Sequence, residues 1–166
     1  QPTDYPLGRR VRFHENVIAA GQTPSRRISR TETRPCDADE ARALKLKPGD
    51  PVHVLEGVSL ADGQPIAAFR SVFPATDFPA LLDLVRETGS ITRALAASGL
   101  PDYTRAETRL TAQLADPVLA VALSVRPGAP VLRTVALNVD ARGVPVEHGL
   151  TWFAGERVTL TVAGQP

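Results

Sequence analysis

The feature that most constrains the fold is a hairpin in the middle of the chain. Residues 52–61 alternate along their length, with apolar side chains such as Val58 and Leu60 on one face. Asp62-Gly63 follows at once, and this dipeptide is a strong signal for a two-residue turn. Residues 64–73 then return as the partner strand. The sequence therefore predicts an antiparallel pair around which the other elements are arranged.

Further strands and helices flank this hairpin. Strands are expected at residues 24–35, 103–114, 131–139, 144–153 and 157–162, the last two completing the sheet. Helices are expected at residues 9–20, 38–46 and 117–123, from a cap at Thr76 or Asp77 through Val85, and from Ser90 onward. Residues 1–8 are expected to lack regular structure, because they contain Pro2, Pro6 and Gly8. Hairpins dominate, with helices between them, which predicts an α+β fold with an antiparallel sheet flanked by helices.

Length and charge limit the class of protein. The chain has 166 residues, which suffices for one domain with a hydrophobic core, and we expect residues 1–166 to form a single domain. A formal net charge of +1 favours neither nucleic acid nor a membrane surface as a direct partner. We see no signal peptide and no apolar run near the roughly 20 residues of a membrane span, and so expect a cytoplasmic protein. The lack of methionine and the start at Gln1 indicate a fragment.

The sequence contains no recognisable catalytic, nucleotide-binding or metal-binding motif. It lacks an HExxH pair, a phosphate-binding loop, a dinucleotide-binding glycine string and a nucleophile elbow. The three histidines are widely scattered, and the lone Cys36 allows neither an internal disulfide nor a thiolate cluster. We therefore expect no enzyme activity, no metal and no cofactor.

One candidate anion site is the start of the helix at residues 89–93. Backbone N–H groups at a helix start lack partners and lie at the positive end of the helix dipole. Ser90 and Thr92 add hydroxyl groups, and Arg93 adds positive charge. Such a terminus can accept phosphate or carboxylate. The alternative is an ordinary helix cap with no ligand.

Charged residues on the strands are further candidates. Arg105, Glu107 and Arg109 alternate, so they are expected on one strand face, where they either line a ligand site or coat a solvated surface. Glu56 shares a face with buried apolar residues, so it needs either an arginine partner or a wet pocket. The basic run at residues 25–30 is interpreted as an exposed strand.

Several short motifs, taken in order, resemble one known family over nearly the whole chain. They are residues 9–16 ahead of Gly21, Leu55-Glu56 followed by Ala61-Asp62-Gly63-Gln64-Pro65-Ile66, Phe73-Pro74, residues 89–95, residues 138–140 followed by Gly143-Val144-Pro145-Val146-Glu147, and residues 154–158. Their order and spacing are similar to those of the UTRA domain, the ligand-sensing half of HutC-type GntR regulators. Residues 90–95 followed by Asp102-Tyr103 look most like the PhnF subgroup, which regulates phosphonate use.

The resemblance implies a fold like that of chorismate lyase, a homodimer, and a cavity for a small anionic effector such as phosphate, a phosphonate or a sugar phosphate. It also implies that contact with DNA is made only by a winged helix-turn-helix domain that precedes this part and is absent from the chain. Carried over by motif, the ligand-binding positions are Ser90 and Thr92 for the phosphate, Phe13 with its neighbours Arg12 and His14, and Glu147.

One departure from the family concerns the phosphate contact. Many sugar-phosphate sensors have Arg-x-Arg where this chain has Gly57-Val58-Ser59. The candidates to replace those arginines are Arg12, Arg70, Arg93, Arg105 and Arg109, while Glu56 and Glu147 would orient arginines or bind a ligand amine. The sequence is thus interpreted as the effector-binding and dimerisation domain of a GntR-family repressor. The alternatives are a chorismate lyase-like enzyme and a ligand-free dimerisation module.

Overall fold

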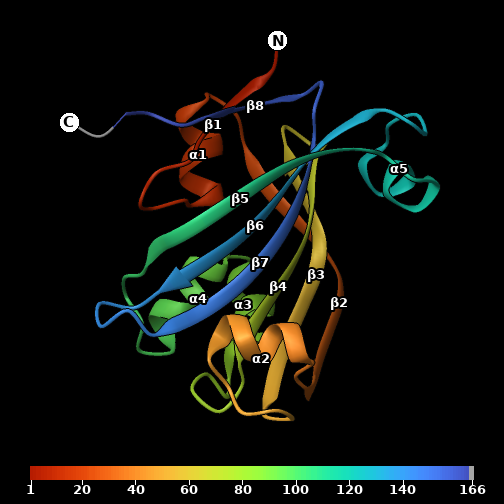
Figure 1. Cartoon of the computed structure of the whole chain (residues 1–166). Coiled ribbons are helices and arrows are strands. Elements are labelled where there is room, and N and C mark those ends of the chain that lie inside the picture. Colours follow the sequence, from red (N-terminus) through yellow and green to blue (C-terminus); the bar gives the residue numbers. More distant parts are fainter. Residues whose placement is uncertain (165–166) are drawn as a thin grey trace.

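The computed structural model describes residues 1–164 and contains one large antiparallel sheet (Figure 1). Six strands lie in the order β2-β3-β4-β7-β6-β5, and β1 and β8 form a separate parallel pair. The strands are β1 (Thr3–Pro6), β2 (Pro24–Pro35), β3 (Pro51–Ala61), β4 (Gln64–Pro74), β5 (Thr104–Leu114), β6 (Pro130–Val139), β7 (Pro145–Ala154) and β8 (Val158–Thr161). The helices are α1 (Phe13–Ala19), α2 (Ala38–Leu44), α3 (Leu81–Thr88), α4 (Ile91–Ala97) and α5 (Pro117–Leu123). The predicted α+β class is confirmed.

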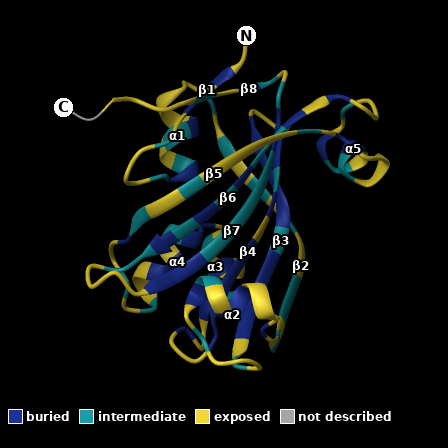
Figure 2. Ribbon diagram, viewed as in Figure 1, coloured by how far each residue is buried: buried dark blue, intermediate teal, exposed yellow. Residues whose placement is uncertain are grey.

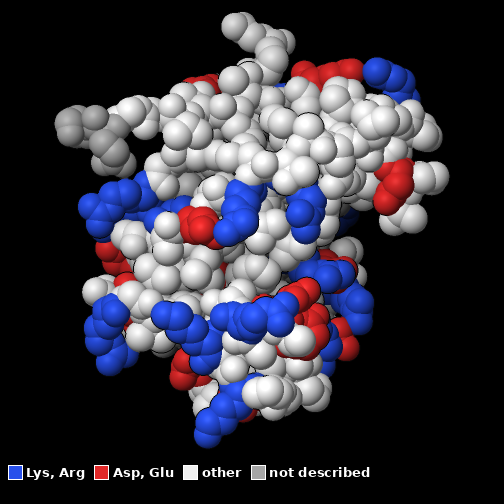
Figure 3. All heavy atoms as spheres, viewed as in Figure 1, with Lys and Arg blue, Asp and Glu red and all other residues white. Residues whose placement is uncertain are grey.

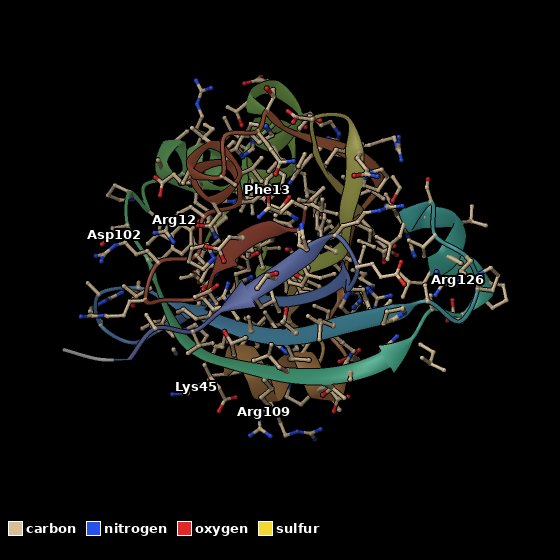
Figure 4. All side chains as sticks on the ribbon, turned by 90° about the horizontal axis from the view of Figure 1, so that it is seen from above. Arg12, Phe13, Lys45, Asp102, Arg109 and Arg126 are labelled. Atoms are coloured by element: carbon tan, nitrogen blue, oxygen red, sulfur yellow. The ribbon has the colours of Figure 1, made fainter. Side chains whose placement is uncertain are left out.

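Helices cover both faces of the sheet, and Figure 4 separates the two layers. Helices α3 and α4 pack on one face, where Leu81 and Leu95 join Leu55 and Phe73 in a buried cluster. Helix α2 packs on the opposite face through Leu44 and strand residues such as Val54 and Val72. Because side chains alternate across a strand, Leu55, Phe69 and Phe73 share the α3–α4 face, and Val146 joins them where the register of β7 shifts. Figure 2 shows the buried band that results along the middle strands.

The elements with the strongest local signals form as predicted. Strand β2 has the predicted bounds, and the hairpin of β3 and β4 turns at Asp62-Gly63, both of which adopt positive φ angles. Helix α4 begins after Ser90, whose side chain accepts a hydrogen bond from the backbone of Arg93. These signals depend on neighbouring residues alone, so the sequence is sufficient to predict them.

The two ends of the chain were predicted incorrectly. Residues 3–6 form β1 rather than an irregular segment, and β8 pairs with β1 instead of completing the large sheet. Pro6 is tolerated in β1 because other residues donate the hydrogen bonds that join this strand to β8. The backbone N–H of Thr3 donates to the carbonyl of Arg157, and that of Leu7 donates to the carbonyl of Thr161, both at 2.7 Å. A proline destabilises a β-sheet only where the N–H that it lacks would have donated a hydrogen bond to the neighbouring strand.

Two helices begin later than predicted, and α2 ends two residues earlier than predicted, at Leu44. Residues 9–12 lie outside the helix, with Arg12 extended, and the carbonyl of Arg9 accepts a hydrogen bond from the backbone of Arg105 at 2.6 Å. Helix α3 begins at Leu81 rather than after Thr76 or Asp77, because Pro79 disfavours helical geometry in the residue before it. The extended stretch before α1 lies beside the start of β5, and this contact positions it over the sheet.

A bulge in β5 changes which residues share a face. The register shifts between Arg105 and Glu107, so the prediction that Arg105, Glu107 and Arg109 face the same way is wrong. Arg105 lies on the α3–α4 face and donates to Thr108 on that same face. Glu107 and Arg109 lie on the other face, and Figure 4 shows Arg109 directed away from Arg12 and Phe13. A bulge inserts one residue and inverts the alternation beyond it.

Candidate functional site

A polar cavity of about 90 Å³ lies between the sheet and the segment that precedes and begins α1. Its floor is formed by the α3–α4 face of the sheet, including Ser71, Thr134 and Gly149. Its cover comes from the N-terminal part of the chain, through Tyr5, Leu7, Val11 and Phe13, and from Ile91 and Thr92 of α4. A space of this size holds several water molecules or one compact ligand.

Arg26 of β2 lines the cavity and has no acidic partner among residues 1–164. Its guanidinium lies over the rings of Phe13 and Phe69, at 4.7 and 5.3 Å from the ring centres. Its Nε is enclosed and makes no hydrogen bond within the described chain. Burial lowers the pKa of Arg26, because removal from water disfavours the charged form. No carboxylate among residues 1–164 therefore contacts the Arg26 guanidinium, although Glu147 of the same cavity favours its charged form.

A second arginine, Arg105, is linked to Glu147 through an amide. Arg105 Nε donates to Asn138 Oδ1 at 2.9 Å, and Asn138 Nδ2 donates to Glu147 Oε1 at 3.0 Å. All three side chains line the cavity, and burial is the main cause of the lowered pKa of Arg105. The amide holds the guanidinium and the carboxylate in fixed positions without letting them touch.

Hydroxyl groups complete the wall. Thr92 Oγ1 and the Tyr103 hydroxyl are hydrogen-bonded at 2.8 Å, and burial raises the pKa of Tyr103 and of Tyr5. Both phenols therefore stay neutral at physiological pH and can donate or accept a hydrogen bond. The fixed charges at the cavity are then Arg26, Arg105 and Glu147, which leaves a net positive charge.

A second, smaller group of candidate residues lies outside this cavity, between α1 and α4. A recess there, which shares Thr92 with the cavity, is lined by Arg12, His14, Glu15, Thr88, Ser90, Thr92 and Arg93. Arg12 stacks on the Tyr103 ring at 3.7 Å and donates through Nη2 to the Tyr103 carbonyl at 2.7 Å, while its Nη1 is buried without a partner. Figure 4 shows Arg12 close to Asp102, which also binds Arg10. Burial lowers the pKa of His14.

The predicted site residues thus fall into three groups. Phe13, Thr92, Arg105 and Glu147 line the cavity. Arg12, His14, Ser90 and Arg93 line the adjacent recess, where the Ser90 hydroxyl is engaged as a helix cap. The rest lie on the opposite face of the sheet: Glu56 pairs with Arg70 at 3.0 Å, and Arg109 pairs with Glu107 at 3.1 Å with 75% of its side chain exposed. Figure 3 shows how such paired charges are scattered over the surface.

The sequence interpretation did not identify Arg26 as a site residue. It assigned residues 25–30 to an exposed strand, whereas Arg26 lies opposite Ser59 with its side chain over the cavity. Gly57 of β3 explains why the cavity arginine, Arg26, comes from the neighbouring strand β2 and not from β3. A Cβ at Gly57 would lie 2.5 Å from the carbonyl oxygen of Arg27, so no arginine fits at position 57 unless β2 moves. Arg26 and its partner on β3, Ser59, can be identified as cavity residues only when the pairing of β2 with β3 is known.

Residues 1–164 contain neither a candidate metal-binding cluster nor a helix suited to span a membrane. This part of the chain brings together no group of three or more histidine, cysteine, aspartate or glutamate side chains that could hold a metal ion. Within the same range, no helix combines the length and the apolar character needed to cross a membrane.

Comparisons with known proteins give a consistent result. A family model described as the UTRA domain matches residues 19–159. An HTH-type transcriptional regulator of Rhizobium meliloti is 35% identical over 158 residues, which are 95% of this chain and 65% of the regulator. The crystal structure of PhnF from Mycobacterium smegmatis has a TM-score of 0.88 at 24% identity, covering 99% of this chain and 72% of that one. The structure of its effector domain has a TM-score of 0.83 at 22% identity, covering 98% and 99% respectively.

Proposed function

Because the chain belongs to the UTRA domain family, we propose that it is the effector-binding part of a DNA-binding transcription regulator and that its cavity binds a small anion. The observation that carries this proposal is the pair Arg26 and Arg105, which line one cavity without an acidic partner within 4 Å in the described chain. Partly buried charges that no opposite charge contacts are costly. An anion would supply charge-assisted hydrogen bonds to both guanidinium groups.

The size of the cavity favours a compact anion. A space of about 90 Å³ suits phosphate or a short phosphonate better than a sugar phosphate. Hydroxyl groups of Ser59, Ser71, Thr134 and Thr151 line the same space and can donate to the remaining oxygens of a tetrahedral anion. This choice agrees with the glycine at position 57, where a sugar-phosphate sensor would carry an arginine.

The cover of the cavity provides a route from effector to DNA. We place a winged helix-turn-helix domain ahead of residue 1, so that its connection would run through β1 and residues 7–13. This stretch contributes Tyr5, Leu7, Val11 and Phe13 to the cavity wall. An anion that changes the position of this wall would move the DNA-binding domain and, in a repressor, release the operator. A coupling free energy of about 1–3 kcal/mol is enough for a several-fold to hundredfold change in occupancy.

We further propose a homodimer formed through β5, which is an edge of the large sheet. Leu110 and Leu114 expose 47% and 70% of their surface, and the adjoining α5 exposes two valines. The other edge strand, β2, begins and ends with proline, which discourages pairing.

A thermal-shift experiment tests the anion site. Phosphate, sulfate and methylphosphonate are added to the purified chain and to two variants, Arg105→Gln and the matched surface control Arg109→Gln. A ligand at about one hundred times its Kd stabilises the folded state by about 2.7 kcal/mol. We expect wild type and Arg109→Gln to respond equally and Arg105→Gln to respond weakly. Equal responses in all three proteins, or none in the wild type at saturating concentrations, would contradict the proposal.

A further inference from the structure

The cavity holds charges of both signs that are not paired with one another. Glu147 is buried, with 9% of its surface exposed, and no Lys, Arg or His nitrogen lies within 4 Å of it in the described part of the chain. The donors of Arg105 go to the neutral side chains of Asn138 and Thr108 instead. A buried carboxylate normally has a cationic partner, so this separation requires an explanation.

Asn138 keeps the two charges apart. Its carboxamide accepts from Arg105 on one side and donates to Glu147 on the other. Arg105 therefore stays available as a cationic position and Glu147 as an anionic one. Both line the same cavity and are spaced by one amide group.

Glu147 is unfavourable for a ligand that is only an anion. A carboxylate in the same enclosed space repels an oxyanion, and repulsion between like charges is strong where water is excluded. One carboxylate oxygen binds Asn138, and no hydrogen bond to the other occurs within residues 1–164. Gly149, the next residue on this face of β7, has no side chain, and a Cβ there would come within 3.9 Å of that second oxygen, Oε2. Oε2 therefore lies over Gly149, and both residues line the cavity, where a ligand group can approach this oxygen.

From these contacts we infer that the effector is a compact zwitterion, with a tetrahedral oxyanion held by Arg26 and Arg105 and an ammonium group held by Glu147. This inference rests on the proposed anion site and adds a second, cationic position to it. A cavity of about 90 Å³ favours a short link between the two charged groups. Aminoalkylphosphonates and aminoalkylsulfonates have this chemistry.

The experiment compares ligands that differ only in the amine. Ethylphosphonate and 2-aminoethylphosphonate are titrated calorimetrically into the wild-type chain, Glu147→Gln and the surface control Glu107→Gln. A charge-assisted hydrogen bond predicts at least about tenfold tighter binding of the amine in wild type and in Glu107→Gln. In Glu147→Gln that preference should fall to about one, while ethylphosphonate binds as tightly as before or more tightly because the repulsion is gone. A merely structural role for Glu147 would weaken both ligands alike.

The outcomes separate this inference from the proposal on which it rests. If wild type binds the two phosphonates equally, the ammonium position is refuted and the anion site stands. If wild type binds neither ligand nor phosphate, the anion site itself is refuted. The wild-type comparison decides the question even if Glu147→Gln does not fold.

Discussion

Replacing Arg26 by methionine should stabilise the unliganded chain and abolish its response to anions. Methionine is unbranched and flexible, so it can fill the space of the arginine stem between the two aromatic rings. The change removes a guanidinium whose Nε is enclosed without a partner and whose pKa is lowered by burial. Positions that bind ligands are often strained in this way, and stability rises when they are replaced.

The magnitude follows from two opposing effects. Loss of the cation–π contacts with Phe13 and Phe69 costs about 0.5–1 kcal/mol each. Removal of a partly buried charge that no carboxylate contacts within residues 1–164 offsets this loss by up to several kcal/mol, the size of the effective desolvation penalty of a buried ion. The net effect should raise the free energy of unfolding by about 1 kcal/mol or more, which corresponds to a rise in Tm of roughly 2–4 °C per kcal/mol for a chain of this length.

Differential scanning calorimetry with and without methylphosphonate measures both effects. The matched control is Arg109→Met, which replaces an arginine that is 75% exposed on the opposite face of the sheet. The control should keep both the wild-type Tm and the wild-type response to the ligand. A lower Tm for Arg26→Met without ligand would refute the view that this cation is held unsatisfied for an anion. A preserved ligand response would remove Arg26 from the site.

Three further outcomes test other parts of the structure. Arg10 holds the pKa of Asp102 at about 2, so ionised Asp102 stabilises the fold above about pH 4, and this stabilisation is lost as pH falls through 2. Asp102→Asn should therefore lower the Tm near pH 6 but not near pH 2, and melting curves at both pH values check this. Gly57→Ala should lower the Tm by several degrees, since the new Cβ would meet the Arg27 carbonyl at 2.5 Å; an unchanged Tm would show that β2 moves freely. Leu110→Glu should convert a dimer into a monomer in light scattering with little change in the fold, and a mass unchanged from wild type would rule out the β5 interface.

The sequence predicted the parts of the fold that depend on neighbouring residues. The turn at Asp62-Gly63 and the cap at Ser90 are local signals, and the structure contains both. The parallel pairing of Thr3 with Val158 joins opposite ends of the chain, and no local pattern encodes it. Long-range pairing depends on tertiary packing, which overrides local propensity.

The site was predicted in part for the same reason. Glu147 and Thr92 were assigned by family motifs, and both line the cavity. Simple alternation placed Arg105 and Arg109 on one face, but the bulge between Arg105 and Glu107 separates them. Arg26 came from a run that resembled a solvated strand, and only its pairing with Ser59 places it at the site. A one-residue shift in register exchanges the two faces of a strand, so alternation alone could not identify the cavity residues.

The pairing of β1 with β8 has a practical consequence for any protein joined to this one. Tyr5 of β1 packs against Phe153 with 5.1 Å between ring centres, and the same tyrosine lines the cavity. A tag, reporter or domain fused ahead of Thr3 would therefore act directly on the wall of the proposed ligand cavity. A fluorescent donor placed there, with an acceptor after β8, would report ligand occupancy as a change in energy transfer. The paired strands β1 and β8 are therefore a suitable attachment site for a biosensor.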